Sequence, residues 1–246
     1  MPYAIMQTSL DPPTVEQLAA AFRTVPRLTP YDAALQAKDA FGVLIGGLSF
    51  QEATAIQTAL KGRGVGACVA EEAALPVLPP TKTLARADWP AECLVLYEVL
   101  GRPRNVPWKQ LVLIAAGDVN LREFKRTHKD VIVADSGGFP IAVRDFDVAE
   151  VDERRLLADL FLSDGGRFRI QPKSFHYAYL GPRMKARSSV NFILLLRDLF
   201  RHASGASCNR GASMLAGDPP RTFRYPSRHA YEEELLWCLW ARSQTQ

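Results

Sequence analysis

A dense group of prolines near residue 80 places the strongest constraint on how this chain folds. The segment 73–90 contains Pro76, Pro79, Pro80 and Pro90. Proline fixes φ and removes a backbone N–H donor, so this segment cannot form a continuous helix or a central strand. We therefore expect a domain at residues 1–72, an extended linker at residues 73–90 and a second domain at residues 91–246. The alternative is a long surface loop inside one domain.

The first domain alternates between strand and helix patterns. Short apolar runs suited to strands occur at 3–7, 41–45 and 65–70. Between them, apolar residues recur every three or four positions, as in helices with one buried face. Capping boxes begin two of these helices, pairing Thr14 with Gln17 and Ser49 with Glu52. Pro30 is well suited to the first position of a further helix. The sequence therefore predicts a small unit with the order β-α-α-β-α-β.

Part of this unit resembles a known interaction module. Residues 28–70 combine an alanine-rich helix, an apolar strand, a Gly-hydrophobic-Ser-x-x-Glu-Ala helix and a Gly-x-x-Val strand. This pattern resembles the C-terminal domain of the bacterial ribosomal stalk protein, and the Clp protease adaptor has a similar topology. The resemblance implies an interaction domain. The stalk domain binds factors through helix lysines, whereas Lys38 and Lys61 are the only lysines here, so we do not carry factor binding over. A packing role alone is the alternative.

Beyond residue 90 the pattern changes to strands separated by glycine-rich turns. Apolar runs occur at 93–100, 106–116, 131–134, 141–143 and 156–162, and 175–179 is an aromatic strand pattern. Hairpin turns are expected at Asp135–Gly138 and at Ser163–Gly166. In the short strand at 167–170, arginines alternate with apolar residues. This alternation predicts that Arg167 and Arg169 face solvent.

The fold expected for the second domain is an antiparallel sheet or small barrel with C-terminal helices. Helical spacing begins after Ser188 or Ser189, either of which could cap a helix, and again near Ser227. Residues 93–170 resemble bacterial pleckstrin-homology-like domains, through the run from Arg104 to Leu113. That resemblance implies an assembly or membrane-surface module without chemistry of its own. The whole chain is therefore predicted to be α+β.

Positive charge is concentrated in the last third of the chain. The first 166 residues carry seventeen basic and twenty-one acidic residues, whereas the last eighty carry thirteen and five. Clustered bases attract acidic partners such as nucleic-acid backbones. The candidate binding residues are Arg183, Lys185, Arg187, Arg201, Arg210, Arg221, Arg224 and Arg228. The alternatives are that these arginines pair with the acid-rich part of the same chain, or that they bind an acidic protein or membrane surface.

No motif indicates catalysis or metal binding. The segment Asp135–Gly138 matches the nucleophile region of chymotrypsin-like proteases, but the only earlier histidine is His128, eight residues away, so we interpret it as a turn. The four histidines lack metal-ligand spacing. The glycines at 62–66 follow a helix and lack the spacing of a phosphate loop. We therefore expect no catalytic residue, no metal and no cofactor.

The sequence favours a non-catalytic interaction or adaptor protein with an unidentified protein partner. Nucleic-acid binding through the basic third is the alternative, and an uncharacterised enzyme is the third hypothesis. Residues 1–10 lack a secretory signal pattern, no apolar run is long enough to span a membrane, and the four cysteines show no C-x-x-C spacing. We therefore expect a cytoplasmic protein, and the oligomeric state stays open.

Overall fold

The chain folds into two sheets with helices packed on each. The computed structural model describes residues 1–90, 92–99, 101–134 and 140–245, with the segments 122–134 and 140–152 described through their backbone only. One sheet has three strands, and the other has eight. The N-terminal unit precedes a sheet that is followed by C-terminal helices, so the predicted α+β class is confirmed.

The N-terminal unit has the predicted order β-α-α-β-α-β. Its elements are β1 (Tyr3–Gln7), α1 (Val15–Phe22), α2 (Pro30–Asp39), β2 (Val43–Leu48), α3 (Phe50–Lys61) and β3 (Ala67–Glu71). The sheet runs β2-β1-β3, and both pairs are antiparallel. Each helix begins at a capping box, with N-caps at Thr14, Thr29 and Ser49. The helices pack on the sheet and bury a hydrophobic core, separate from that of the larger sheet, that includes Leu18, Phe22 and Ile56.

The larger sheet combines antiparallel and parallel pairs. Its strands are β4 (Thr81–Asp88), β5 (Cys93–Glu98), β6 (Arg104–Pro107), β7 (Leu111–Ala134), β8 (Pro140–Leu162), β9 (Arg167–Ile170), β10 (Ser207–Cys208) and β11 (Arg224–Tyr225). The order is β10-β7-β8-β9-β4-β5-β6, with β11 also paired to β7. The β8–β9 hairpin turn at Ser163–Gly166 is confirmed, and Gly165 there adopts φ +86°. The expected strand 106–116 is interrupted by a 3-10 turn at Trp108–Gln110.

The predicted linker is wrong over its second half. Strand β4 lies inside the larger sheet, parallel to β9 on one side and antiparallel to β5 on the other. The prolines do not prevent this, because Pro79 and Pro80 come before the strand and Pro90 comes after it. The proline-rich composition therefore marks the two ends of a strand, and the connector between the units is shorter than expected.

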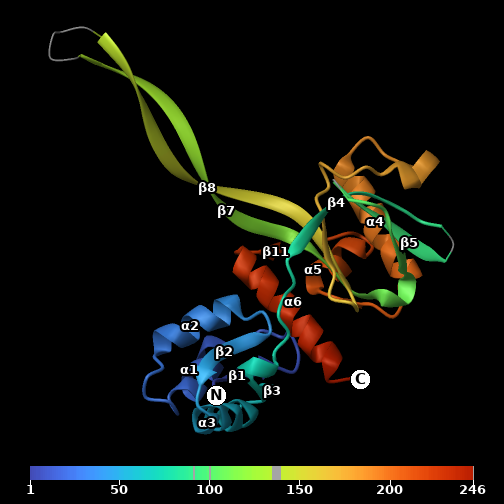
Figure 1. Ribbon diagram of the computed structural model, residues 1–246. Helices are drawn as coiled ribbons and strands as arrows, with labels where there is room; N and C mark the ends of the chain where they lie inside the picture. The colour runs from blue at the N-terminus through green and yellow to red at the C-terminus, as the bar shows by residue number, and fades with distance from the viewer. Residues whose placement is uncertain (91, 100, 135–139, 246) are drawn as a thin grey trace.

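The longest strands form a hairpin that extends away from the rest of the molecule. Strands β7 and β8 pair continuously from Leu113–Phe161 outwards to Ala134–Pro140, and their distal half projects beyond both units (Figure 1). The turn predicted at Asp135–Gly138, including Ser136, lies outside the described residues. The two strands that flank this turn are antiparallel, as a hairpin requires.

In the described part of the chain, three α-helices follow β9, and the last of them contacts both units. They are α4 (Ser188–His202), α5 (Arg210–Ala216) and α6 (Arg228–Ser243). Figure 1 shows α6 between the N-terminal unit and the larger sheet. The Trp237 indole N–H donates to the Gln7 carbonyl at 2.7 Å, and Phe41 packs in a core shared with Tyr225 and Leu235. The expected strand 175–179 is absent: His176 makes one isolated bridge to Arg86, and a 3-10 turn follows at Ala178–Arg183.

Candidate functional site

Two arginines predicted to face solvent are instead bound to a buried carboxylate. Asp159 on β8 is 0% exposed, and the side chains of Arg167 and Arg169 on β9 are 3% and 13% exposed. Arg167 Nη2 and Arg169 Nη2 each lie 2.7 Å from Asp159 Oδ2, and Arg169 Nε lies 2.8 Å from Oδ1. The prediction was wrong because Asp159 stands directly opposite Arg169 in the β8–β9 ladder. The charged donors of two arginines offset the cost of burying this carboxylate.

Arg169 also lines a pocket of about 520 Å³ at the base of the projecting hairpin. Three further cations line it: Arg154 and Arg155 from β8 and Lys173 from the segment after β9. Arg155 pairs with Glu153 at 2.9 Å, and Arg154 lies 3.8 Å from Asp118. Although burial opposes its charge, Asp159 raises the guanidinium pKa of Arg169, so this group stays cationic.

The start of α4 forms another wall of this pocket through Ser188 and Ser189. The sequence predicted one of them as the helix cap, but the N-cap is Arg187, which makes no side-chain capping bond. Ser188 and Ser189 therefore occupy the first helical positions, where backbone N–H groups have no partner within the helix. The loop before α4 is held in place by Asn191, whose Oδ1 accepts from the Lys185 backbone N–H at 2.7 Å.

Four of the predicted binding residues gather around α4. Arg183 and Arg201 both donate to Asp198, whose side chain is 5% exposed, with the Arg183 Nη2 to Oδ2 distance at 2.7 Å. Lys185 and Arg187 are exposed on the loop between Arg183 and the helix. Two of these four exposed cations therefore share an internal acid, and the other two lie on the loop that leads into α4.

Arg210 does not belong to that surface. Its guanidinium binds Glu234, which is 0% exposed, with Nη2 at 2.9 Å from Oε2. It also lies over the rings of Phe41 and Phe223, at 5.1 and 4.7 Å from their centroids. Arg210 therefore joins α5 to α6 and to the N-terminal unit.

The remaining predicted residues lie near β11 and the start of α6. Arg224 approaches Asp118 at 3.7 Å, the same carboxylate that Arg154 approaches, and Arg228 binds Glu232 at 3.1 Å. Arg221 is exposed, and its backbone N–H donates to the Met214 carbonyl. The eight predicted residues thus fall into a group around α4, a group near β11 and the interior Arg210.

Sequence reasoning missed the cations of the pocket. The predicted binding residues begin at Arg183, so they do not include Arg154, Arg155 or Lys173. Arg169 was predicted to face solvent. The available signal was the density of bases on both sides of the Ser163–Gly166 turn. Because β8 and β9 are antiparallel neighbours, bases at similar distances before and after the turn come close together.

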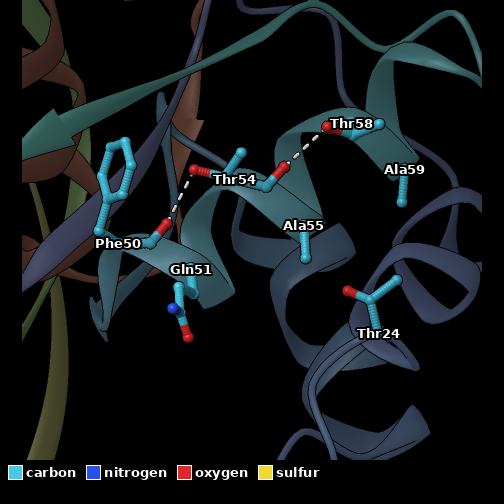
Figure 2. Close-up of a pocket in the computed structure, with 7 residues that line it drawn as sticks. All are labelled: Thr24, Phe50, Gln51, Thr54, Ala55, Thr58 and Ala59. Atoms are coloured by element: carbon cyan, nitrogen blue, oxygen red, sulfur yellow. Dashed lines mark hydrogen bonds between the residues drawn. The ribbon is translucent and has the colours of Figure 1, made fainter.

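A second hollow, of about 560 Å³, is open and apolar and lies beside α3 (Figure 2). Ala55 and Ala59 project from α3 towards the side where Thr24 lies. Thr54 and Thr58 turn their hydroxyls back to the carbonyls four residues earlier, at 2.8 and 2.9 Å. Their methyl groups therefore contribute apolar surface. Phe50, at one end of the helix, is 59% exposed.

The described side chains offer little for catalysis or for metal binding. Within the residues that the structure describes, no three His, Cys, Asp or Glu side chains are placed to hold a metal ion. His229 lies 3.3 Å from Glu233, one helical turn away. Burial, followed by the charge of Asp198, raises the pKa of the Tyr179 hydroxyl, which opposes its use as a base. Burial likewise raises the pKa of the Cys238 thiol.

Comparisons with known proteins add no relative: no protein family, curated protein or solved structure was found to match this chain. The resemblances of residues 28–70 and 93–170 to known domains therefore stay predictions. None of the helices in the described part of the chain has the length and apolarity needed to cross a membrane.

Proposed function

We propose that this chain is a non-catalytic, cytoplasmic interaction protein, and that it binds a protein partner through the hollow beside α3. The feature that supports this proposal is an apolar surface left uncovered on a helix of the N-terminal unit. Large exposed apolar patches on soluble proteins commonly mark interaction sites. Here Phe50 is exposed, and Ala55 and Ala59 leave room between α3 and Thr24.

The chemistry of the hollow indicates what kind of group it accepts. The threonine hydroxyls are satisfied by the backbone of α3, so they do not compete for a ligand's hydrogen bonds. The surface presents methyl groups and one aromatic ring, which suits an apolar side chain from a partner helix or extended segment. The Phe50 ring, edge-on to Tyr3 at 5.3 Å between centroids, offers an exposed aromatic contact at the end of this surface.

An Ala55→Arg substitution tests this proposal, because a long charged side chain would fill the hollow. The tagged full-length chain and its variants would be used to capture partners from the source cells, and retained proteins would be quantified by mass spectrometry. The control is Ala73→Arg, the same change at an exposed alanine outside the hollow. We expect a defined protein to be retained by the wild type and by the control, and to fall at least tenfold with Ala55→Arg. If no retained protein distinguishes the two variants, α3 is not the docking surface.

Nucleic-acid binding is the second candidate function. The observation that favours it is the exposed surface formed by Arg183, Lys185, Arg187 and Arg201 around α4. Electrophoretic mobility shift with mixed DNA and RNA across a salt series tests it, because affinity from phosphate contacts falls steeply with salt. The absence of any retarded species at low salt would eliminate this function. Reversal of the four charges would distinguish these residues from bases elsewhere.

A further inference from the structure

Four cations line the pocket at the base of the hairpin, and Lys173 and Arg154 are the two that the described acids pair with least. Within the described part of the chain, Lys173 has no ion-pair partner, and Arg154 has only the 3.8 Å approach to Asp118. Arg155 keeps its bond to Glu153, which is one acid among the four cations that line the cavity. Confining like charges in a partly enclosed space is unfavourable unless an anion joins them.

The orientation of Arg169 gives this pocket a fixed donor. Its Nε and Nη2 atoms are held by the two oxygens of the buried Asp159. Among the residues that the structure describes, Nη1 has no acceptor, while the side chain lines the cavity. Because the neighbouring Arg167 binds the same carboxylate, the guanidinium of Arg169 cannot turn away without breaking a buried ion cluster. Such preorganised donors bind anions at a lower entropic cost than mobile surface lysines.

Hydroxyl and backbone donors from the start of α4 also line the pocket. Ser188 and Ser189 bring two hydroxyls, and their backbone N–H groups have no acceptor in the described residues. At the start of the fifteen-residue helix α4 these groups carry a partial positive charge. They supplement the four cations, which are the main attraction for a ligand. A phosphate group, with its several acceptor oxygens, matches such a mixture of charged and neutral donors.

The size and the apolar part of the pocket indicate a small organic ligand. A volume of about 520 Å³ lies within the range of small-molecule sites. Leu156, Leu157 and Pro172 provide an apolar wall beside the cations. The pocket is partly enclosed, which suits a small molecule better than a polymer backbone that needs an open groove. We propose that this pocket binds a small phosphorylated organic molecule, with its phosphate between Arg169, Lys173 and the first turn of α4. This proposal does not depend on the docking surface beside α3.

Titration calorimetry with the full-length protein tests this site. The probes are inorganic pyrophosphate, adenosine monophosphate, adenosine, succinate and a single-stranded oligonucleotide. We expect saturable one-to-one binding of pyrophosphate and adenosine monophosphate, and binding of adenosine and succinate at least tenfold weaker. Lys173→Gln and Arg154→Gln should each weaken the phosphate probes at least tenfold. Lys38→Gln is the matched control, an exposed lysine on α2 far from the pocket in the chain, and it should leave binding unchanged.

A spectroscopic readout separates a defined site from general attraction to a basic protein. In ¹⁵N spectra, the Ser188 and Ser189 amide resonances should shift during the pyrophosphate titration and should follow the calorimetric curve. Equal weakening by Lys38→Gln, or no shift at these two amides, would overturn the proposal. So would the absence of saturable binding, or succinate binding as tight as pyrophosphate. Binding of the oligonucleotide alone, with a steep salt dependence, would replace the small ligand with a nucleic-acid backbone.

Discussion

The two units of the molecule treat charge differently. In the N-terminal unit, acids such as Asp32 and Glu52 begin helices and stay at the surface, where Glu52 pairs with the half-exposed Arg27. In the C-terminal unit, Asp159 and Glu234 are completely buried, and each is bound by arginine. Aspartate and glutamate therefore stabilise helix starts in the N-terminal unit, whereas in the C-terminal unit they hold strands and helices together.

This difference shows why net charge is a poor guide to binding surfaces. The last third of the sequence is strongly basic, but Arg167 and Arg210 are bound to buried acids and are not available to a partner. The cations that remain accessible are those around α4, near β11 and in the pocket at the hairpin base. The hydrogen-bond partners of each arginine, and not the count of bases, separate structural arginines from candidate binding residues: all three side-chain nitrogens of Arg210 donate within the chain, whereas only two of those of Arg169 do so among the described residues.

The largest effect is expected from Asp159→Asn. This change leaves Arg167 and Arg169 without their shared carboxylate, and removal of one partner from a buried ion pair typically costs about 3–5 kcal/mol. Glu232 still lies 3.3 Å from Arg167, but this single pair cannot compensate for the loss of Asp159. We expect the free energy of unfolding in urea to fall by about that amount.

The control for this experiment is Asp164→Asn, the same change in the turn that joins β8 to β9. Asp164 pairs with Arg104, and its side chain is 45% exposed. Exposed ion pairs typically contribute about 0.2–1 kcal/mol, so a small loss is expected. If the two variants lose similar free energy, burial does not distinguish these carboxylates, and the contrast between buried and surface acids is wrong.

A smaller effect is expected from Glu234→Gln, at the point where the two units meet. Glu234 accepts from the Arg210 backbone N–H at 2.8 Å and from its guanidinium, and Arg210 lies over Phe41 of the N-terminal unit. Neutralising the acid weakens charged hydrogen bonds that are each typically worth about 1.5–3 kcal/mol. We expect a loss of that order in urea unfolding.

Hydrogen exchange would show which part of the molecule is destabilised by Glu234→Gln. Amides of β1 and β2 should exchange faster in Glu234→Gln, because Arg210 helps to hold the N-terminal unit against α6. The control is Glu98→Gln, which alters a partly exposed pair with Lys82 within the larger sheet. Unchanged exchange in the N-terminal unit would mean that Trp237 and Phe41 hold the joint without Arg210.

The N-terminal unit was predictable from sequence because its signals are local. The boxes at Thr14 and Ser49 mark helix starts that depend on residues three positions away, and both are confirmed. The larger sheet depends on distant pairing. Strand β4 pairs with β9, more than eighty residues later, and no local pattern predicts that neighbour.

The candidate sites were less predictable than the fold, for a related reason. An alternation of arginine with apolar residues is the same whether the arginines face water or a buried acid, so the environment of Arg169 could not be inferred from its strand alone. The pocket cations come from β8, from β9 and from the segment after β9, and the start of α4 adds two serines. Only the folded arrangement brings them together.

The smallest effect concerns the surface pair of the N-terminal unit and its dependence on pH. Hydrogen bonds from Arg27 and from the Ser49 backbone lower the pKa of Glu52 from 4.5 to about 2. Because the folded state has the lower pKa, the stabilisation is complete above about pH 4.5 and is lost as the pH falls towards 2. The difference in unfolding free energy between the wild type and Glu52→Gln should therefore be constant at neutral pH and shrink across that window.

An NMR titration of the Glu52 carboxylate measures the same property directly. A midpoint near pH 2 would mean that the Glu52 carboxylate accepts from the Ser49 backbone at the start of α3 and from Arg27 at the same time. A midpoint near 4.5 would mean that neither bond persists in solution. The contrast between the two units would then be sharper, because the charges of the N-terminal unit would contribute to helix ends only weakly, while those of the C-terminal unit hold its interior.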